Sequence, residues 1–263
     1  MTRAAEVVVR ALSGGRLDAR RALFFADAPV DDVMSFPVVA WLVEHPRGRL
    51  VFDTGLHPDT AADPVGRLGA GRASRFRVTS RPGDDVVASL ARLGVAADAV
   101  THVVNSHLHF DHCGCNRCFG RARVLVQRIE LDAMRALRDR GVDDPGDWDD
   151  PARTPETIDG EHDVFGDGTV VAFPTPGHTV GHQSLRIVTR SGRCVVLTGD
   201  AVYTERHLDD DMLPPGGAVW HASTMSDSMA RLRAMRDRDG AMLLYGHDDA
   251  QWRALVAAGG LVD

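Results

Sequence analysis

The chain has 263 residues, which is enough for one large domain with a sizeable buried core. Its net charge of −7 argues against general nucleic-acid binding, because that function requires a basic surface. No apolar run reaches the roughly 18 residues that span a membrane, and the N-terminus lacks the apolar stretch of a signal peptide. We therefore expect a cytoplasmic protein that binds neither nucleic acid nor membrane.

Short runs of β-branched residues predict strands along the whole chain. In chain order these runs are 6–12, 38–45, 49–55, 101–107, 123–127, 169–176, 184–189, 194–200 and 241–248. Amphipathic helical patterns lie between them at 84–94, 130–141, 223–240 and 248–260. In the first helical pattern Val86 and Leu90 share a face, and Gly94 follows as a C-cap. This alternation favours layered α/β packing in a single domain over residues 1–263.

Two stretches between these elements predict loops by composition. Residues 57–83 are rich in Gly, Pro and Arg, and residues 141–163 are rich in Asp and Pro. Long loops in compact domains often form lids or substrate walls, so the first stretch is a candidate cover for a functional site.

Three histidines and an aspartate fall within six positions, as His107, His109, Asp111 and His112. If the preceding strand continues through them, His107 and His109 point to the same side, because side chains alternate along a strand. Asp111 and His112 then lie in the turn beyond it. Imidazole and carboxylate groups are ligands for zinc, iron, cobalt and manganese, so the cluster predicts a metal site.

Further candidate ligands follow apolar runs elsewhere in the chain. His178, Asp200 and His247 each come after a predicted strand and a small glycine-containing turn. Taken singly, each is compatible with an ordinary turn or cap residue. Their shared context predicts that they meet the histidine cluster at one end of the sheet.

The motifs together resemble the metallo-β-lactamase superfamily. They are FDTG (52–55), HLHFDH (107–112), PGHTVGH (176–182), GD (199–200) and GHD (246–248), in the family's order. Within that superfamily the chain is most similar to the N-acyl-homoserine lactonases, through SHLHFDHCG (106–114), VLVQRIELDAM (124–134), PGHTVGHQSL (176–185) and GDAVYT (199–204). The motif set is specific for the fold and the metal site, and less specific for the substrate.

The resemblance implies an α/β fold of the αβ/βα type, a four-layer sandwich of two mixed sheets flanked by helices. It also implies two divalent metal ions per chain, usually zinc, with cobalt, iron or manganese as alternatives. On this basis one ion is held by His107, His109 and His178, the other by Asp111, His112 and His247, and Asp200 bridges both. Asp53 of the FDTG motif would support the ligand loop.

The resemblance further implies that a metal-bridging hydroxide opens the lactone ring of N-acyl-homoserine lactones, a reaction called quorum quenching. Tyr203 would stabilise the oxyanion, and Asp111 would pass a proton to the leaving alkoxide. The best candidates for an apolar wall against the acyl chain are Phe110, Phe24, Phe25 and Trp220. A homodimer is expected because the family often forms dimers.

Other functions remain open at this point. The same motifs suit a hydrolase of another lactone, such as a pyridoxolactone, a thioesterase of the glyoxalase II type, or a metal-dependent sensor that hydrolyses nothing. Tyr203 favours lactone chemistry over the thioesterase. Cys113, Cys115 and Cys118 depart from the family pattern, and we expect them to be ordinary thiols rather than ligands of a further metal.

Overall fold

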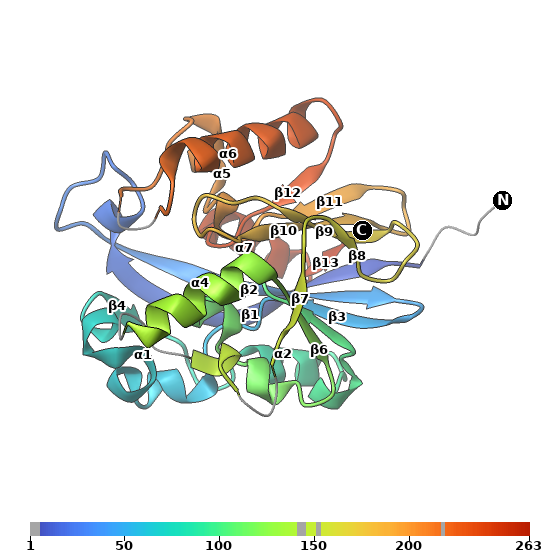
Figure 1. Ribbon diagram of the computed structural model, residues 1–263, viewed down its shortest axis with the longest axis horizontal. Helices are drawn as coiled ribbons and strands as arrows, with labels where there is room; N and C mark the ends of the chain where they lie inside the picture. Colours follow the sequence, from blue (N-terminus) through green and yellow to red (C-terminus); the bar gives the residue numbers. More distant parts are fainter. Residues whose placement is uncertain (1–5, 141–145, 151–153, 217–218) are drawn as a thin grey trace.

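A computed structural model describes residues 6–140, 146–150, 154–216 and 219–263. In these residues two β-sheets lie face to face between layers of helices (Figure 1). The larger sheet has the order β13-β1-β2-β3-β5-β6-β7, with β4 paired to β1, and the smaller has the order β12-β11-β10-β9-β8. The arrangement confirms the predicted α/β sandwich of two mixed sheets.

The strands of the larger sheet are β1 (Val8–Arg20), β2 (Val33–His45), β3 (Gly48–Phe52), β4 (Phe76–Val78), β5 (His102–Val104), β6 (Arg123–Gln127), β7 (Glu156–Ile158) and β13 (Leu261–Val262). Those of the smaller sheet are β8 (His162–Asp163), β9 (Val170–Pro174), β10 (Gln183–Val188), β11 (Cys194–Leu197) and β12 (Met242–Leu244). The α-helices are α1 (Pro64–Ala73), α2 (Val86–Arg92), α3 (Phe110–Cys113), α4 (Arg128–Asp139), α5 (Glu205–Asp209), α6 (Ala222–Asp237) and α7 (Asp249–Ala257). Short 3₁₀ helices are η1 (Arg21–Leu23), η2 (Pro58–Ala61), η3 (Ala97–Ala99), η4 (Asn116–Cys118), η5 (Gly146–Trp148) and η6 (Gly199–Ala201).

Three of the buried apolar clusters show how the layers are held together. The largest lies between the sheets and includes Trp41 and Phe52 from one side and Leu185 from the other. On the outer face of the larger sheet, α2 contributes Val86 and Leu90. On the outer face of the smaller sheet, α6 contributes Met225, Met229 and Leu232. Burial of these faces is the main force that fixes the order helix, sheet, sheet, helix.

The strand directions bring several strand ends to one edge of the sandwich. In the larger sheet β3, β5 and β6 are parallel, so their carboxyl ends lie together. In the smaller sheet β11 and β12 are parallel, and β10 is antiparallel to both β9 and β11, so β9, β11 and β12 end at the same edge. The backbone N–H of Gln183 donates a hydrogen bond of 2.9 Å to Ser106 O, which joins the two edges.

The prediction that residues 57–83 and 141–163 form loops is wrong in part. Within 57–83 the chain forms α1 and β4, and α1 begins with Pro64 after the capping residue Asp63, whose Oδ1 accepts from Gly66 N at 2.9 Å. Composition obscured this helix start, although Asp followed by Pro is a recognisable signal. Within 141–163 the chain forms η5, β7 and β8, while 141–145 and 151–153 lie outside the described residues.

The four predicted helices are confirmed in place. The first ends as expected at Gly94, whose φ of +72° lies in the left-handed region that a glycine C-cap adopts at low cost. In the described parts of the chain, no helix combines the length and the apolar character required to cross a membrane.

Candidate metal centre

The seven predicted ligands lie at the edge where strands of both sheets end. At the edge of the larger sheet, His107 follows β5, His109 lies at the start of α3, and Asp111 and His112 lie within α3. At the edge of the smaller sheet, His178 follows β9, Asp200 lies in η6 after β11, and His247 follows β12. All of these side chains are buried except His109, which is half-buried. The tertiary structure thus gathers residues that are up to 140 positions apart (247 − 107).

We predicted that His107 and His109 converge because one strand carries both, and this explanation is wrong. Strand β5 ends at Val104, so neither histidine lies on a strand. The chain instead turns after β5, and His109 is the N-cap of α3. This turn brings His107 Nε2 to 2.9 Å from His109 Nδ1.

The first group of candidate ligands consists of three histidines. His178 Nε2 lies 3.1 Å from His107 Nε2 and 3.0 Å from His109 Nδ1, so three ring nitrogens face a common point. Burial, together with the neighbouring imidazoles, lowers the pKa of His107 and His109 well below the usual value. Neutral imidazole is the form that binds a metal ion.

The second group contains Asp111, His112 and His247. Asp111 Oδ2 lies 3.7 Å from the Nε2 atoms of both histidines. The remaining Nδ1 of His247 lies 2.9 Å from Pro37 O, which requires it to donate a proton and leaves Nε2 free to be a ligand.

Asp200 lies between the two groups. Its Oδ1 is 3.3 Å from His112 Nε2 and 3.2 Å from His247 Nε2, in the second group. Its Oδ2 is 3.4 Å from His178 Nε2, in the first group. Burial by itself would raise the pKa of Asp200, but His112 and His247 outweigh it and hold that pKa well below the usual range. One carboxylate thus presents one oxygen to each group.

The chemistry of these atoms fits bound divalent cations. His112 Nε2 and Asp200 Oδ1 are buried and have no hydrogen-bond partner among the described residues, although they face each other. With a single proton, on His112 Nδ1, both facing atoms carry lone pairs, and positive charge between them, either a second proton or a cation, removes the conflict. Asp200, Asp111 and Asp53 also place an excess of negative charge around His112, which raises its pKa well above the usual value against the effect of burial. The His and Asp clusters therefore indicate sites for divalent metal ions.

Asp53 supports the ligand loop from the end of β3. Its Oδ2 accepts from His112 Nδ1 at 2.8 Å, and its Oδ1 accepts from the backbone N–H of Ser106 at 2.7 Å. Its φ of +58° is unusual for a residue other than glycine, and such strain is common at functional sites. Gly55, in the same motif, has a φ of +68° and packs so closely on Gly14 that a Cβ atom would lie 2.4 Å from Gly14 Cα.

We expect Asp53→Asn to weaken metal binding by about 10–100-fold, the usual effect of removing an outer hydrogen-bond partner of a ligand. The amide that replaces the carboxylate is uncharged. Its oxygen can still accept from His112 Nδ1, but its NH₂ group must then face the backbone N–H of Ser106, which is also a donor. Zinc titration against a chromophoric chelator measures the loss. Affinity equal to that of the unmodified protein would show that Asp53 only caps its turn.

His182 is a site residue that sequence reasoning missed. It lies in the same PGHTVGH motif as His178, but its Nε2 accepts from the backbone N–H of Asp200 at 3.0 Å, and its Nδ1 donates to Thr175 Oγ1 at 2.9 Å. Burial lowers the pKa of His182 to about 3, so it stays neutral. It thus fixes Asp200 rather than acting as a ligand, and the second histidine of the motif was the available signal.

Tyr203 stands beside the first group of ligands. Its hydroxyl lies 3.0 Å from His178 Nδ1. Burial, with Asp200 and Asp111 nearby, raises its pKa well above the usual value, so the hydroxyl stays protonated. Because His178 Nε2 faces the ligand group, Nδ1 carries the proton and donates to the Tyr203 oxygen, and the hydroxyl proton is left to point elsewhere.

The predicted apolar wall is brought together only in part. Phe24 and Phe25 are buried in one cluster with Tyr203, and Phe110 packs against that cluster. The Phe24 ring lies 5.4 Å from the Tyr203 ring, and Phe110 lies 5.6 Å from Phe76 of β4. The segment expected as a cover thus contributes Phe76 to this cluster. Trp220 is not part of it among the described residues, and the residue is 56% exposed.

The three cysteines take no part in the ligand groups. Cys113 and Cys115 are buried and Cys118 is half-buried, and all are free thiols. Burial raises the pKa of Cys113 well above the usual value. Within the described residues, none of the three belongs to a group of potential metal ligands.

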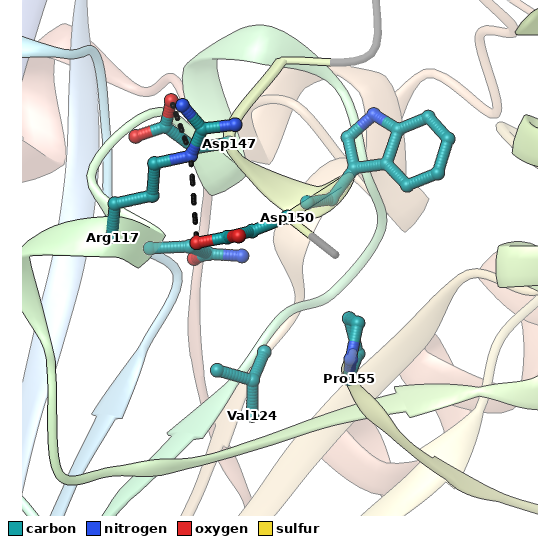
Figure 2. A pocket seen from close by; sticks show the side chains of 7 residues that line it. Arg117, Val124, Asp147, Asp150 and Pro155 are labelled. Carbon is teal, nitrogen blue, oxygen red and sulfur yellow. Dashed lines mark ion pairs between the residues drawn. The ribbon is translucent and has the colours of Figure 1, made fainter. Parts of the chain in front are cut away.

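A small pocket lies apart from the ligand groups, between η4 and η5. Its lining residues are Asn116, Arg117, Val124, Asp147, Trp148, Asp150 and Pro155 (Figure 2). Arg117 Nε lies 3.9 Å from Asp147 Oδ1 and 4.0 Å from Asp150 Oδ2. None of the predicted ligands lines this pocket, so it is not part of the metal centre.

Comparison with known proteins agrees with this geometry. A family model described as the metallo-beta-lactamase superfamily matches residues 34–247. The chain is 33% identical to the N-acyl homoserine lactonase AttM of Azorhizobium caulinodans over 86% of this chain and 88% of that protein. It is 31% identical to the N-acyl homoserine lactonase AiiA of Bacillus thuringiensis subsp. kurstaki, over 83% and 84% of the two chains.

A solved structure extends the likeness to the whole fold. It is an N-acyl homoserine lactone hydrolase with the product N-hexanoyl-L-homoserine bound at the catalytic metal centre. The TM-score is 0.82 at 26% identity, over 94% of this chain and 95% of that one. The chain therefore belongs to the metallo-beta-lactamase superfamily and, within it, to the family of the N-acyl homoserine lactonases.

Proposed function

We propose that this protein is a metal-dependent hydrolase that opens the lactone ring of N-acyl-homoserine lactones and so quenches quorum sensing. The observation that carries the proposal is the position of Asp200, with one oxygen facing each ligand group and the Tyr203 hydroxyl beside one of them. Two groups of candidate ligands that share a carboxylate suit a pair of ions, and relatives that match most of this chain are named as N-acyl homoserine lactonases.

The proposed ligands are His107, His109 and His178 for one ion and Asp111, His112 and His247 for the other, with Asp200 shared. We propose zinc for both, since neutral imidazole and carboxylate are its common ligands, while cobalt, iron and manganese accept a similar set. When bound, such ions polarise a carbonyl oxygen and supply a nucleophilic hydroxide at neutral pH.

The chain's own groups would orient the substrate and move the protons. The Tyr203 hydroxyl, kept protonated by burial, is free to donate to the oxygen of the lactone carbonyl as negative charge develops there. Asp111 has an exposed side-chain fraction of only 12%, and its carboxylate would carry a proton to the alkoxide that leaves when the ring opens.

The acyl chain of the substrate would pack on the aromatic cluster beside Tyr203. Phe24 and Phe25 form its buried side, and Phe110 packs against it; Phe110 is half-buried and lies in sequence between the candidate ligands His109 and Asp111. The contact of the Phe24 ring with Tyr203 supports an apolar wall that begins where the lactone ring would lie. Trp220 is the weakest of the four proposed wall residues because of its exposure.

The test is hydrolysis of lactones by the purified protein, followed by proton release in a weakly buffered solution. We expect fast ring opening of N-acyl-homoserine lactones, loss of activity after chelation, and recovery when zinc is added back. A simple γ-lactone and a thioester serve as comparison substrates. Turnover of the thioester alone would assign the protein to a thioesterase function, and two bound metals without any turnover would favour a sensor.

The remaining expectations concern the whole protein. We propose that residues 1–263 act as one domain, and that the protein is a cytoplasmic homodimer that acts on a small molecule and binds no nucleic acid. Light scattering of the purified chain tests the dimer, and a monomeric mass would contradict it.

A further inference from the structure

Glu130 is a buried carboxylate outside the ligand groups. It lies near the start of α4, directly beyond the end of β6, and is only 1% exposed. A buried charge of this kind is costly unless hydrogen bonds satisfy it. Neither the proposed reaction nor the ligand set uses this side chain, so its burial needs another explanation.

The two oxygens of Glu130 join the two segments that carry the first group of ligands. Oε1 accepts from the backbone N–H of Leu108 at 3.2 Å, and Leu108 lies between His107 and His109. Oε2 accepts from the backbone N–H of Gly181 at 2.9 Å, three residues after His178. One carboxylate thus connects, through backbone atoms, the loops that carry these three histidines.

Close packing makes this connection rigid. A Cβ atom at Gly181 would lie 2.5 Å from both N and Cβ of Glu130, so the loop backbone rests directly on the start of α4. The distance between the His178 loop and α4 is therefore fixed by contact as well as by a hydrogen bond. Such contact limits the freedom of the loop more than a hydrogen bond alone would.

The second group of ligands is held by different residues. His112 Nδ1 is paired with Asp53 at 2.8 Å, and His247 Nδ1 donates to Pro37 O at 2.9 Å. Neither support involves Glu130. Loss of the Glu130 contacts should therefore disturb one group of ligands and spare the other.

We propose that Glu130 is a positioning residue that selectively sets the affinity for the ion at His107, His109 and His178. The proposal rests on the proposed function only in that the site holds two ions. Outer hydrogen-bond partners of ligands typically change metal affinity by about 10–100-fold. We expect a loss of that size at one ion and little change at the other.

The test is the variant Glu130→Gln in the full chain. The amide has nearly the same shape, but its NH₂ group must face the N–H of either Leu108 or Gly181, so one of the two hydrogen bonds is lost. Titration of the apo-protein with Co²⁺ should give one tight and one weakened site. The absorption spectrum of the tightly held ion should match that of the single ion retained by His109→Ala.

Two further variants complete the experiment. Gly181→Ala disturbs the same contact from the loop side and should weaken the same ion. Val170→Ala removes two methyl groups from the buried core at the distant end of β9 and should lower thermal stability without selective metal loss. Equal weakening of both ions in Glu130→Gln, or no weakening, would overturn the proposal. Selective loss in a protein that hydrolyses no lactone would overturn the proposed function alone.

Discussion

We expect His109→Ala to retain one metal ion per chain in place of two and to lower kcat/KM for lactone hydrolysis by about 10³-fold. His109 Nδ1 faces His107 Nε2 and His178 Nε2 at 2.9 and 3.0 Å, so its removal leaves two histidines in the first group. A metal ion supplies several kcal/mol of transition-state stabilisation, and each 1.36 kcal/mol corresponds to a factor of ten in rate. Metal analysis after extensive dialysis, together with the proton-release assay, measures both effects.

The matched control for this variant is His162→Ala. His162 is half-buried in β8, outside the ligand groups, so its loss should leave the metal content and the rate nearly unchanged. Two metal ions per chain in His109→Ala would show that the ligand assignment is wrong. Loss of both ions would show instead that the two ions bind cooperatively through Asp200.

Tyr203→Phe should lower kcat by about 10²–10³-fold, the usual effect of losing one oxyanion donor. The structure adds a second effect. His178 Nδ1 donates to the Tyr203 oxygen at 3.0 Å, so the phenyl ring removes that hydrogen bond from a buried site. We therefore expect both ions to remain bound at saturating metal, with about 10–100-fold weaker affinity at the ion of His178.

Tyr245→Phe is the control, because Tyr245 is the other tyrosine of the chain and is also buried. It lies after β12 and belongs to the apolar cluster under α6 rather than to the wall beside the ligands. It should keep full activity and full metal affinity. An unchanged kcat in Tyr203→Phe would remove the oxyanion role, while a selective loss of metal affinity would leave Tyr203 as a support for His178.

The local sequence was sufficient to predict an element where a single interaction decides the conformation. The C-cap of α2 is an example, since Gly94 adopts a φ of +72° that other residues avoid. Buried strands such as β11 are another, because their continuous apolar residues are covered on both faces. Local composition failed for 57–83, where the cap by Asp63 starts α1 although Gly69, with a φ of +73°, kinks the helix.

The candidate ligands could be named from sequence, but the reason for their convergence could not. A strand through His107 was the natural reading of THVVNSH, yet β5 has only three residues because its pairing with β3 and β6 ends at Val104. Trp220 shows the same limit, since its apolar character predicted a wall residue and tertiary packing leaves it exposed.

The sequence by itself determined the family, the layered α/β class and the seven candidate ligands, because these depend on residue types and their order. Only the tertiary structure decided which atoms of the site contact one another. The two oxygens of Asp200 face different ligand groups, His182 holds the backbone of Asp200, and Glu130 joins two loops, because packing of the two sheets brings their strand ends to one edge. These contacts join residues far apart in the chain, and no local pattern of the sequence encodes them.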